Sequence, residues 1–252
     1  MRTLIYETLH GSRAYGLARP GSDTDLKGLY VARRELYLGF LSEREQVDLS
    51  PDHALYEIRK FMRLAAKANP SMIELLFTDP QDHLFVSEAG AMLLSQRSAF
   101  LSQLVEQTFA RYASSQLKRI RRHRAWILRP PRPGEGGWTK YQEWRAHRNP
   151  ARARLEELYG YDTKHGMHLI RLLRMALEMT VEGVVRVRRP DREELLGIRD
   201  GSLSYEQLVG HAEELLADIE HSPSVLPREP DLQGLQSLCV EIVEVCHAHA
   251  DA

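Results

Sequence analysis

Apolar residues fall in short runs near the start of the chain and recur at helical spacing over the rest of it. The runs Leu4–Leu9 and Leu26–Val31 are rich in β-branched and aromatic residues and are bounded by Gly, Pro and Ser, which predicts two strands. From His53 to Ala68 apolar residues recur every three to four positions, which predicts a helix. Asn69-Pro70 is expected to end that helix, because the residue before a proline disfavours helical backbone.

Ser71 is the expected N-cap of the next helix, with Glu74 three residues later in the capping-box position. Further along, the spacing predicts one or two helices over 91–129, a Pro- and Gly-rich break over 130–137, and helices over 165–179, 205–219 and 232–247. A short hairpin strand is expected over 183–187. We therefore predict an α+β fold, with a small mixed-sheet core in residues 1–85 followed by a mainly helical domain in residues 86–252.

The composition is that of an ordinary globular protein, with 43% hydrophobic and 27% charged residues. The chain has 34 Lys and Arg and 35 Asp and Glu, which leaves a net charge of −1. The charge of the whole chain therefore does not indicate a polyanion partner. No apolar run approaches the roughly 20 residues that a membrane span needs, and the first residues lack the apolar stretch of a signal peptide. These observations predict a soluble, cytoplasmic protein.

The most informative stretch is His10–Gly16 followed by Gly21–Leu26, in which Gly-Ser ends one strand and Asp-x-Asp begins the next. Gly11 lets a phosphate approach the backbone closely, and Ser12 offers a hydroxyl and a backbone N–H at the start of a helix. Asp23 and Asp25 lie two apart in extended chain, so both carboxylates face the same way. Such a pair suits Mg²⁺ or Mn²⁺ bridging to phosphates. The alternative is an Asx-turn or a cap.

This arrangement resembles the DNA polymerase β-like nucleotidyltransferase superfamily, whose signature is Gly-Ser followed by Asp-x-Asp. The resemblance narrows to a bacterial and phage branch of predicted nucleotidyltransferases that includes members associated with RNA repair and RNA ligase operons. It spans about residues 5–220 and is carried by the strings His10–Gly16, Tyr56–Phe61, Lys67–Pro70, Glu74–Phe77 and Tyr161–Arg171.

The resemblance implies a third carboxylate on a neighbouring strand, for which the candidates are Asp52, Asp48 and Glu57. We favour Asp52, whose alternative role is to cap the helix that follows it. With Asp23 and Asp25 it would hold Mg²⁺ or Mn²⁺ as the catalytic set. Gly11, Ser12, Arg13 and Ser22 are the expected contacts to the NTP phosphates.

Lys164, His168 and Arg171 are spaced i, i+4 and i+7 and so share one helical face, which could clamp the triphosphate. Asp162 could cap that helix. The alternative is a solvated face with one buried histidine.

The segment 111–132 carries eight cations and no acid: Arg111, Lys118, Arg119, Arg121, Arg122, Arg124, Arg129 and Arg132. Together with Trp126, this basic segment predicts contact with an RNA or DNA backbone. A solvated cationic helix that pairs with acids elsewhere is the alternative.

The expected reaction is metal-dependent transfer of a nucleoside monophosphate from an NTP to a hydroxyl acceptor. The expected acceptor is an RNA or DNA end, and the resemblance implies a role in RNA repair. Two other function classes stay open: a nucleotide-binding regulatory or toxin–antitoxin module, and a transferase that places AMP on a protein.

Overall fold

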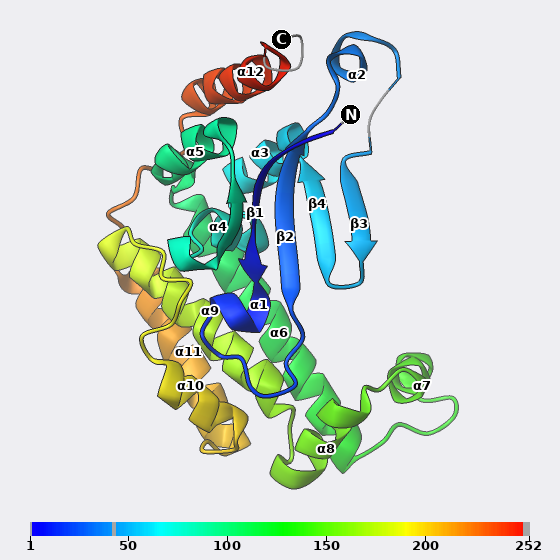
Figure 1. Cartoon of the computed structure of the whole chain (residues 1–252). Coiled ribbons are helices and arrows are strands. Elements are labelled where there is room, and N and C mark those ends of the chain that lie inside the picture. Colours follow the sequence, from blue (N-terminus) through cyan, green and yellow to red (C-terminus); the bar gives the residue numbers. More distant parts are fainter. Residues whose placement is uncertain (1, 42–43, 249–252) are drawn as a thin grey trace. The chain divides into compact units, whose positions relative to one another are not determined.

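A mixed five-stranded sheet forms the N-terminal part of the computed structural model, which describes residues 2–41 and 44–248 (Figure 1). The strand order is β3-β4-β2-β1-β5. β2 pairs parallel with β4, and every other neighbouring pair is antiparallel. Helices follow the sheet along the chain, so the predicted α+β class is confirmed. The strands are β1 (Thr3–His10), β2 (Asp25–Val31), β3 (Gln46–Ser50), β4 (His53–Glu57) and β5 (His83–Val86).

The first strand departs from simple alternation, because two successive residues, Ile5 and Tyr6, are both buried. A shift in the β1–β2 register between Leu4 and Tyr6 accounts for this, since a bulge adds one residue on one side of the ladder. The Tyr6 hydroxyl lies 2.5 Å from Thr78 Oγ1 and 3.2 Å from the carbonyl oxygen of Leu75. β1 is thereby tied to the helix that covers it.

The parallel β2–β4 pair requires a crossover, which residues 32–52 supply through α2 (Arg34–Leu38) and β3. Two helices then cover the sheet, α3 (Ile58–Ala66) and α4 (Pro70–Leu76). The apolar face of α3 is buried at Ile58, Phe61 and Ala65. Asp48, one of the candidates for the third carboxylate, lies within β3.

The helix expected from His53 starts five residues later, at Ile58. The residues before it extend as β4 because they pair on both sides, with β2 and with β3. Glu57 has extended backbone and caps α3 by accepting the N–H groups of Arg59 and Lys60. Strand pairing therefore prevents the first residues with helical apolar spacing from joining the helix.

The predicted cap at Ser71 is also wrong by two residues. Asn69 caps α4, its side chain accepting the backbone N–H groups of Ser71 and Met72, and Pro70 occupies the first helical position, where its missing N–H costs nothing. Glu74, expected in a capping box, instead accepts a 2.6 Å hydrogen bond from the Tyr15 hydroxyl.

Contacts between residues divide the chain into two compact units, the first made of residues 1–108, 178–190 and 223–252. Besides the sheet, α3 and α4, it contains η1 (Pro80–Asp82), α5 (Glu88–Ser95), η2 (Arg97–Phe100) and α12 (Leu232–Ala248). The last helix contacts α3 and α5. Gly90 lets α5 approach β1, because a Cβ there would overlap the carbonyl oxygen of Ile5.

The second unit, residues 109–177 and 191–222, is helical throughout. Its core includes Phe109, Ile120, Leu169, Leu173 and Leu208. Its helices are most of α6 (Leu104–Leu128), α7 (Trp138–Ala146), α8 (Pro150–Tyr159), most of α9 (Thr163–Glu182), α10 (Arg192–Arg199) and α11 (Tyr205–His221).

The helices predicted over 165–179, 205–219 and 232–247 are confirmed, and the predicted break over 130–137 separates α6 from α7. The strand expected over 183–187 does not form. Gly183 instead ends α9, with positive φ and its N–H bonded to the carbonyl of Met179. The division at residue 85/86 stays a prediction, and the compact units have different limits.

Among the helices of the described ranges, none is long and apolar enough to cross a membrane.

The position of Glu57 predicts a large loss of stability on its removal. Its carboxylate is buried and accepts bonds from the Tyr37 hydroxyl, the Arg59 side chain and two backbone N–H groups. We expect Glu57→Ala to lower the free energy of unfolding by about 2–3 kcal/mol, from the lost cap and the unpaired buried groups. Urea unfolding monitored by circular dichroism measures it. Asp52→Ala, in an exposed turn, is the control and should change little; equal midpoints for both variants would contradict the structural role of Glu57.

Candidate active site

The candidate site lies where β1 ends and β2 begins. His10, the last residue of β1, pairs with Asp25, the first of β2, and Gly11 follows His10 directly. Gly11 has φ +61°, a left-handed conformation that glycine adopts without strain. A Cβ on Gly11 would overlap the Asp25 Oδ2 atom and lie 2.9 Å from its Cγ. Only glycine leaves room for that carboxylate at this point.

The loop between Ser12 and Asp25 is held by backbone and side-chain hydrogen bonds. The Ser12 carbonyl accepts the N–H of Leu17 at 2.8 Å. The Arg13 guanidinium donates to the carbonyl oxygens of Ser22 and Asp23, at 3.1 and 3.3 Å. Arg13, predicted as a phosphate contact, therefore holds the loop that carries Asp23 in place.

Ser22 and Asp23, two further loop residues of the predicted site, differ in how they are held. The Ser22 hydroxyl accepts the backbone N–H of Arg19 at 2.9 Å, which uses one of its acceptor positions. Asp23 is exposed, whereas Asp25 is half-buried beside Gly11. Of the two predicted metal ligands, one is thus fixed in the sheet and the other lies on the loop.

The third carboxylate can be judged from the strand register. The backbone N–H of Leu26 donates to the carbonyl of Asp52 at 2.7 Å, and Leu26 lies opposite His53 in the parallel β2–β4 pair. The backbone of Asp52, directly before β4, therefore lies beside the start of β2. It sits in the β3–β4 turn, where its N–H donates to Ser50 Oγ, so its alternative role as a helix cap is wrong.

The other two candidates lie farther away. Asp48 pairs with Ala54 and so shares the sheet face of Lys27, but β3 is two strands from β2, about 10 Å at the usual strand spacing. Glu57 is at the opposite end of β4, about 13 Å along the strand from His53. It is already occupied by the hydrogen bonds that cap α3.

A cluster of buried polar groups extends the site in a way that the motif did not predict. Lys27 lies two residues after Asp25 on the same sheet face, and its ammonium donates to the Ser71 hydroxyl. Burial lowers the pKa of Lys27, against the opposing influence of the Glu74 and Asp25 carboxylates. Glu74 is itself buried and accepts the Tyr15 hydroxyl.

This cluster places one cation beside two acids at the edge where phosphates are expected. The period of two along β2 could have indicated Lys27, because residues i and i+2 of a strand share a face. Nothing in the local sequence could have indicated Glu74, which belongs to α4 and reaches the site only through the packing of that helix on the sheet.

The predicted clamp residues Lys164, His168 and Arg171 lie on α9 within the second unit, and Asp162 caps that helix by accepting the N–H of His165 at 3.0 Å, as predicted. Arg171 is buried, with Nη1 3.1 Å from the Met175 sulfur. Burial, together with nearby Arg171 and Lys164, lowers the pKa of His168 well below its usual value. His168 is therefore neutral at pH 7, and only two of the three residues are cations.

The donors of the candidate metal site are carboxylate oxygens, which Mg²⁺ and Mn²⁺ prefer. Gly11 leaves open the space beside Asp25 that any larger residue would fill. Within residues 2–41 and 44–248, no three His, Cys, Asp or Glu side chains are gathered in a metal-binding geometry. Asp23, Asp25 and Asp52 fit the ion by the chemistry of their oxygens, and their joint role as metal ligands stays a prediction.

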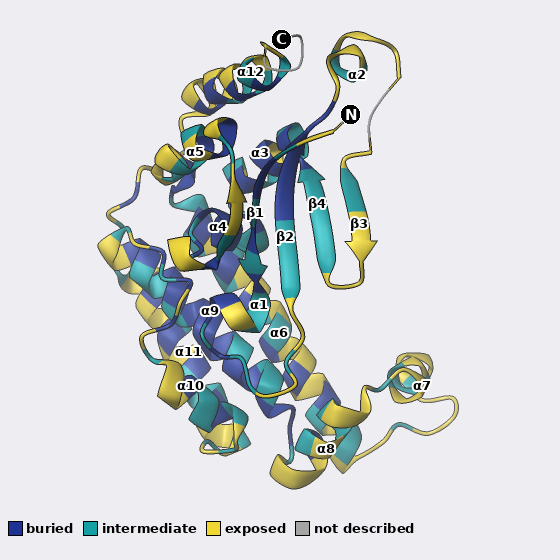
Figure 2. Ribbon diagram, in the orientation of Figure 1, coloured by how far each residue is buried: buried dark blue, intermediate teal, exposed yellow. Residues whose placement is uncertain are grey.

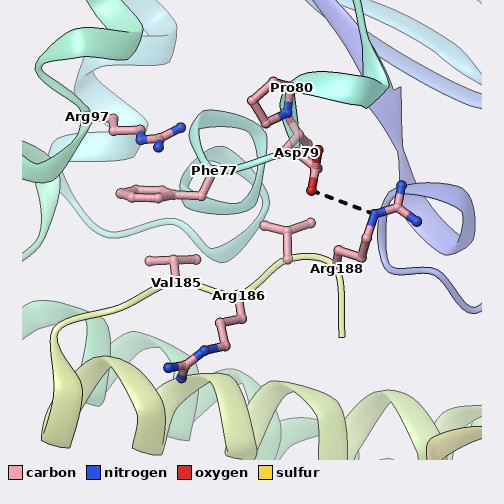
Figure 3. Close-up of a pocket in the computed structure, with 9 residues that line it drawn as sticks. Phe77, Asp79, Pro80, Arg97, Val185, Arg186 and Arg188 are labelled. Carbon is pink, nitrogen blue, oxygen red and sulfur yellow. Dashed lines mark ion pairs between the residues drawn. The ribbon is translucent and has the colours of Figure 1, made fainter. Parts of the chain in front are cut away.

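A separate pocket of about 220 Å³ opens in the first unit between the loop after α4 and residues 185–188 (Figure 3). Arg97 lies over the ring of Phe77, 5.2 Å from its centroid. Arg188 faces Asp79 at 3.9 Å and also binds Asp82 at 2.8 Å. None of the predicted site residues lines this pocket.

The sequence signature of RlaP, described as the RNA repair pathway DNA polymerase beta family, matches residues 2–217. This match indicates a DNA polymerase beta-like nucleotidyltransferase. The chain belongs to the RNA repair pathway DNA polymerase beta family.

Shorter matches join the chain to uncharacterized proteins. It is 36% identical over 81 residues to YcgL of Bacillus subtilis, covering 30% of this chain and 31% of that protein. It is 29% identical over 92 residues to a 38.9 kDa protein from the nrdC-mobD intergenic region of phage T4, covering 32% and 27%. It is 31% identical over 86 residues to MJ0002 of Methanocaldococcus jannaschii, covering 31% and 35%. The matches span about a third of these relatives, and no solved structure matches.

Two glycines with positive φ give a matched test of the Gly11–Asp25 approach. Gly11 has φ +61° and faces Asp25, whereas Gly21 has φ +80° and nothing within 4 Å of its added Cβ. We expect Gly21→Ala to cost about 1 kcal/mol of stability from backbone strain alone. Gly11→Ala should cost more and also displace Asp25, reducing Mg²⁺-dependent NTP turnover at least tenfold. Equal turnover in the two variants would contradict this view of the site.

The neutral state of His168 predicts a pH effect on stability. Its pKa is lowered in the folded protein, so the unfolded chain binds the proton first as the pH falls below about 6.5. Stability is then lost on acidification, with a slope of up to about 1.4 kcal/mol per pH unit for this group. Urea unfolding between pH 7 and pH 5 should show a smaller slope for His168→Gln. The exposed residue His221 is the control, and a slope unchanged in His168→Gln would contradict the assignment.

Proposed function

We propose that the protein is a metal-dependent nucleotidyltransferase that transfers a nucleoside monophosphate from an NTP to a hydroxyl on an RNA end. The observation that carries this proposal is the close approach of Gly11 to Asp25 at the sheet edge, with the backbone of Asp52, in the β3–β4 turn, beside the start of β2. Membership of an RNA repair family supports RNA as the acceptor.

Asp23, Asp25 and Asp52 would hold Mg²⁺ or Mn²⁺, which when bound neutralises phosphate charge and increases the acidity of a coordinated hydroxyl. The backbone N–H groups and hydroxyl at Gly11-Ser12 would receive the terminal phosphates. Arg13 and Ser22 keep the loop with Asp23 against that turn. Lys164, His168 and Arg171 lie on α9 in the second unit, and their predicted contact with the triphosphate stays a prediction from the sequence.

In the transfer, the acceptor oxygen bonds to the α-phosphorus and the bond to the bridging oxygen breaks, releasing pyrophosphate. The acceptor proton passes to a carboxylate of the site. Lys27 supplies a fixed positive charge beside Asp25, which lessens repulsion between the carboxylates and an incoming polyphosphate.

The test is incubation of the pure protein with each α-labelled NTP, Mg²⁺ or Mn²⁺ and a mixed RNA pool. We expect label in RNA, and its loss by at least 10³-fold in Asp23→Asn/Asp25→Asn, on the scale of removing essential charge stabilisation. Asp52→Asn should lose activity to a similar degree. Asp48→Asn, on the same sheet face but one strand farther away, is the matched control and should keep it.

Other outcomes point to other functions. Label in a protein band indicates AMP transfer to a protein. Bound Mg-NTP with no pyrophosphate released indicates a regulatory nucleotide-binding module. Unchanged labelling of RNA in the double variant would contradict the carboxylate mechanism itself.

A further inference from the structure

Four of the six Lys and Arg residues of the long helix α6 lie on or beside one face. At 3.6 residues per turn, Arg111, Lys118, Arg122 and Trp126 fall within a narrow stripe that runs about 22 Å along the helix. The opposite side of α6 is buried at Leu117 and Ile120. Arg111, Lys118 and Arg122 lie in this stripe, and Arg119 borders it. All four side chains belong to exposed residues.

Two other arginines of the segment project away from the stripe, and these two are the ones that acids neutralise. Arg121 pairs with Glu213, and Arg124 pairs with Glu206 at 3.0 Å, both acids being on α11. Over the described ranges, no carboxylate lies within 4 Å of the side-chain nitrogens of the remaining six, Arg111, Lys118, Arg119, Arg122, Arg129 and Arg132. Acids thus pair with the two arginines outside the stripe, as the alternative expected, whereas the cations of the stripe keep their net positive charge.

At the C-terminal end of the stripe, aromatic rings form a continuous group between α6 and α7. Trp126 lies 5.5 Å from Trp144 and 5.9 Å from Tyr141, measured between ring centroids. Tyr141 lies 5.8 Å from Trp144 and 6.0 Å from Trp138. We call these four residues the aromatic platform. All three tryptophans of the chain belong to it.

The platform is not a closed core. None of the residues of α7 is buried (Figure 2), and all four residues of the platform are of intermediate exposure. Cations border it, since the Arg122 guanidinium lies 5.4 Å from the Trp126 centroid and that of Arg148 lies 4.9 Å from the Trp144 centroid. Arg148 is paired with Glu156, whereas no carboxylate of the described residues pairs with Arg122. Partly exposed aromatic rings beside cations are the two components of sites for single-stranded nucleic acid.

We propose that the α6 stripe and the aromatic platform form a binding site for single-stranded nucleic acid, in which the cations contact phosphates and unpaired bases stack on Trp138, Tyr141 and Trp144. The choice of RNA as the strand rests on the proposed function. Charge favours a nucleic acid over a protein, because the chain has no Asp or Glu from residue 107 to residue 134, the range that includes the stripe. The stacking rings distinguish it from a site for a bare polyanion.

Intrinsic fluorescence tests the inference directly, because every tryptophan of the chain is in the platform. The full-length protein is titrated in EDTA, without NTP, with a single-stranded oligoadenylate of about twelve nucleotides, a blunt RNA duplex of that length, and polyphosphate. We expect quenching and tight binding with the single strand, and weaker binding without comparable quenching with the other two. The affinity should fall with salt with a slope of about −3, for four phosphate contacts.

Two neighbouring arginines provide the matched variants. Arg122→Gln removes a stripe cation over Trp126 and should weaken binding about tenfold and lower the salt slope by about 0.7. Arg121→Gln removes an equal charge that Glu213 already neutralises, and should change binding less than twofold. Trp138→Ala, at the edge of the platform, should weaken binding of the single strand about tenfold while Trp138→Phe restores it. Circular dichroism verifies the fold of each.

The outcomes separate this inference from the proposed function. Asp23→Asn/Asp25→Asn should bind the oligonucleotide as the unaltered protein does, since no metal is present. Binding without quenching, or equal losses in Arg121→Gln and Arg122→Gln, would overturn the platform. Absence of RNA binding in a protein that still turns over NTP would also overturn it and leave the nucleotidyltransferase proposal standing. RNA binding without nucleotide transfer would support the binding site and contradict the proposed transfer.

Discussion

The close approach of Gly11 to Asp25 is the constraint on which the candidate site depends. β1 and β2 are paired up to His10 and Asp25, so the turn after β1 must pass directly over the Asp25 carboxylate. A left-handed residue without a Cβ is the solution that the chain uses. This geometry brings a turn with open backbone N–H groups beside a fixed carboxylate, which is what a metal-bound phosphate requires.

The rest of the first unit maintains this arrangement. Pairing of β2 with β4 sets the backbone of Asp52 beside the start of β2. Lys27 and Glu74 add buried charges of opposite sign on the same side, and burial lowers the pKa of Lys27. Glu57 at the far end of β4 serves a different purpose, because it joins α3 to the sheet. Asp52, before β4, thus belongs to the candidate reaction site, whereas Glu57, at the end of β4, is a structural cap.

The sequence predicted features that depend on neighbouring residues. The strands around Gly11 and Asp25, the helix capped by Asp162 and the break before α7 follow from local spacing, turn residues and caps. It could not predict that the residues after His53 extend as β4, because helical spacing does not reveal a strand that pairs on both sides.

The sequence was weaker on charge states and distant contacts. The spacing placed His168 on a possible phosphate-binding face and left a buried histidine as the alternative, because its burial depends on the packing of α9. The sequence counted eight cations in 111–132, whereas acids of α11, some ninety residues later, neutralise two of them. Once α6 is seen as one helix, the cations without a carboxylate partner fall on or beside its exposed face. The platform on α7 was invisible in the sequence, because tryptophans at helical spacing are more commonly core residues.

The carboxylates of β2 and of the β3–β4 turn are proposed to act together on a divalent ion, and metal binding measures this without any assumption about the acceptor. Titration with Mn²⁺ in the presence of a non-hydrolysable NTP analogue, followed by electron paramagnetic resonance, counts the bound ions. The account predicts about two ions per chain, with affinity lost in Asp25→Asn and reduced in Asp52→Asn but kept in Asp48→Asn. Binding that is absent from the unaltered protein, or unaffected by Asp25→Asn, would contradict it.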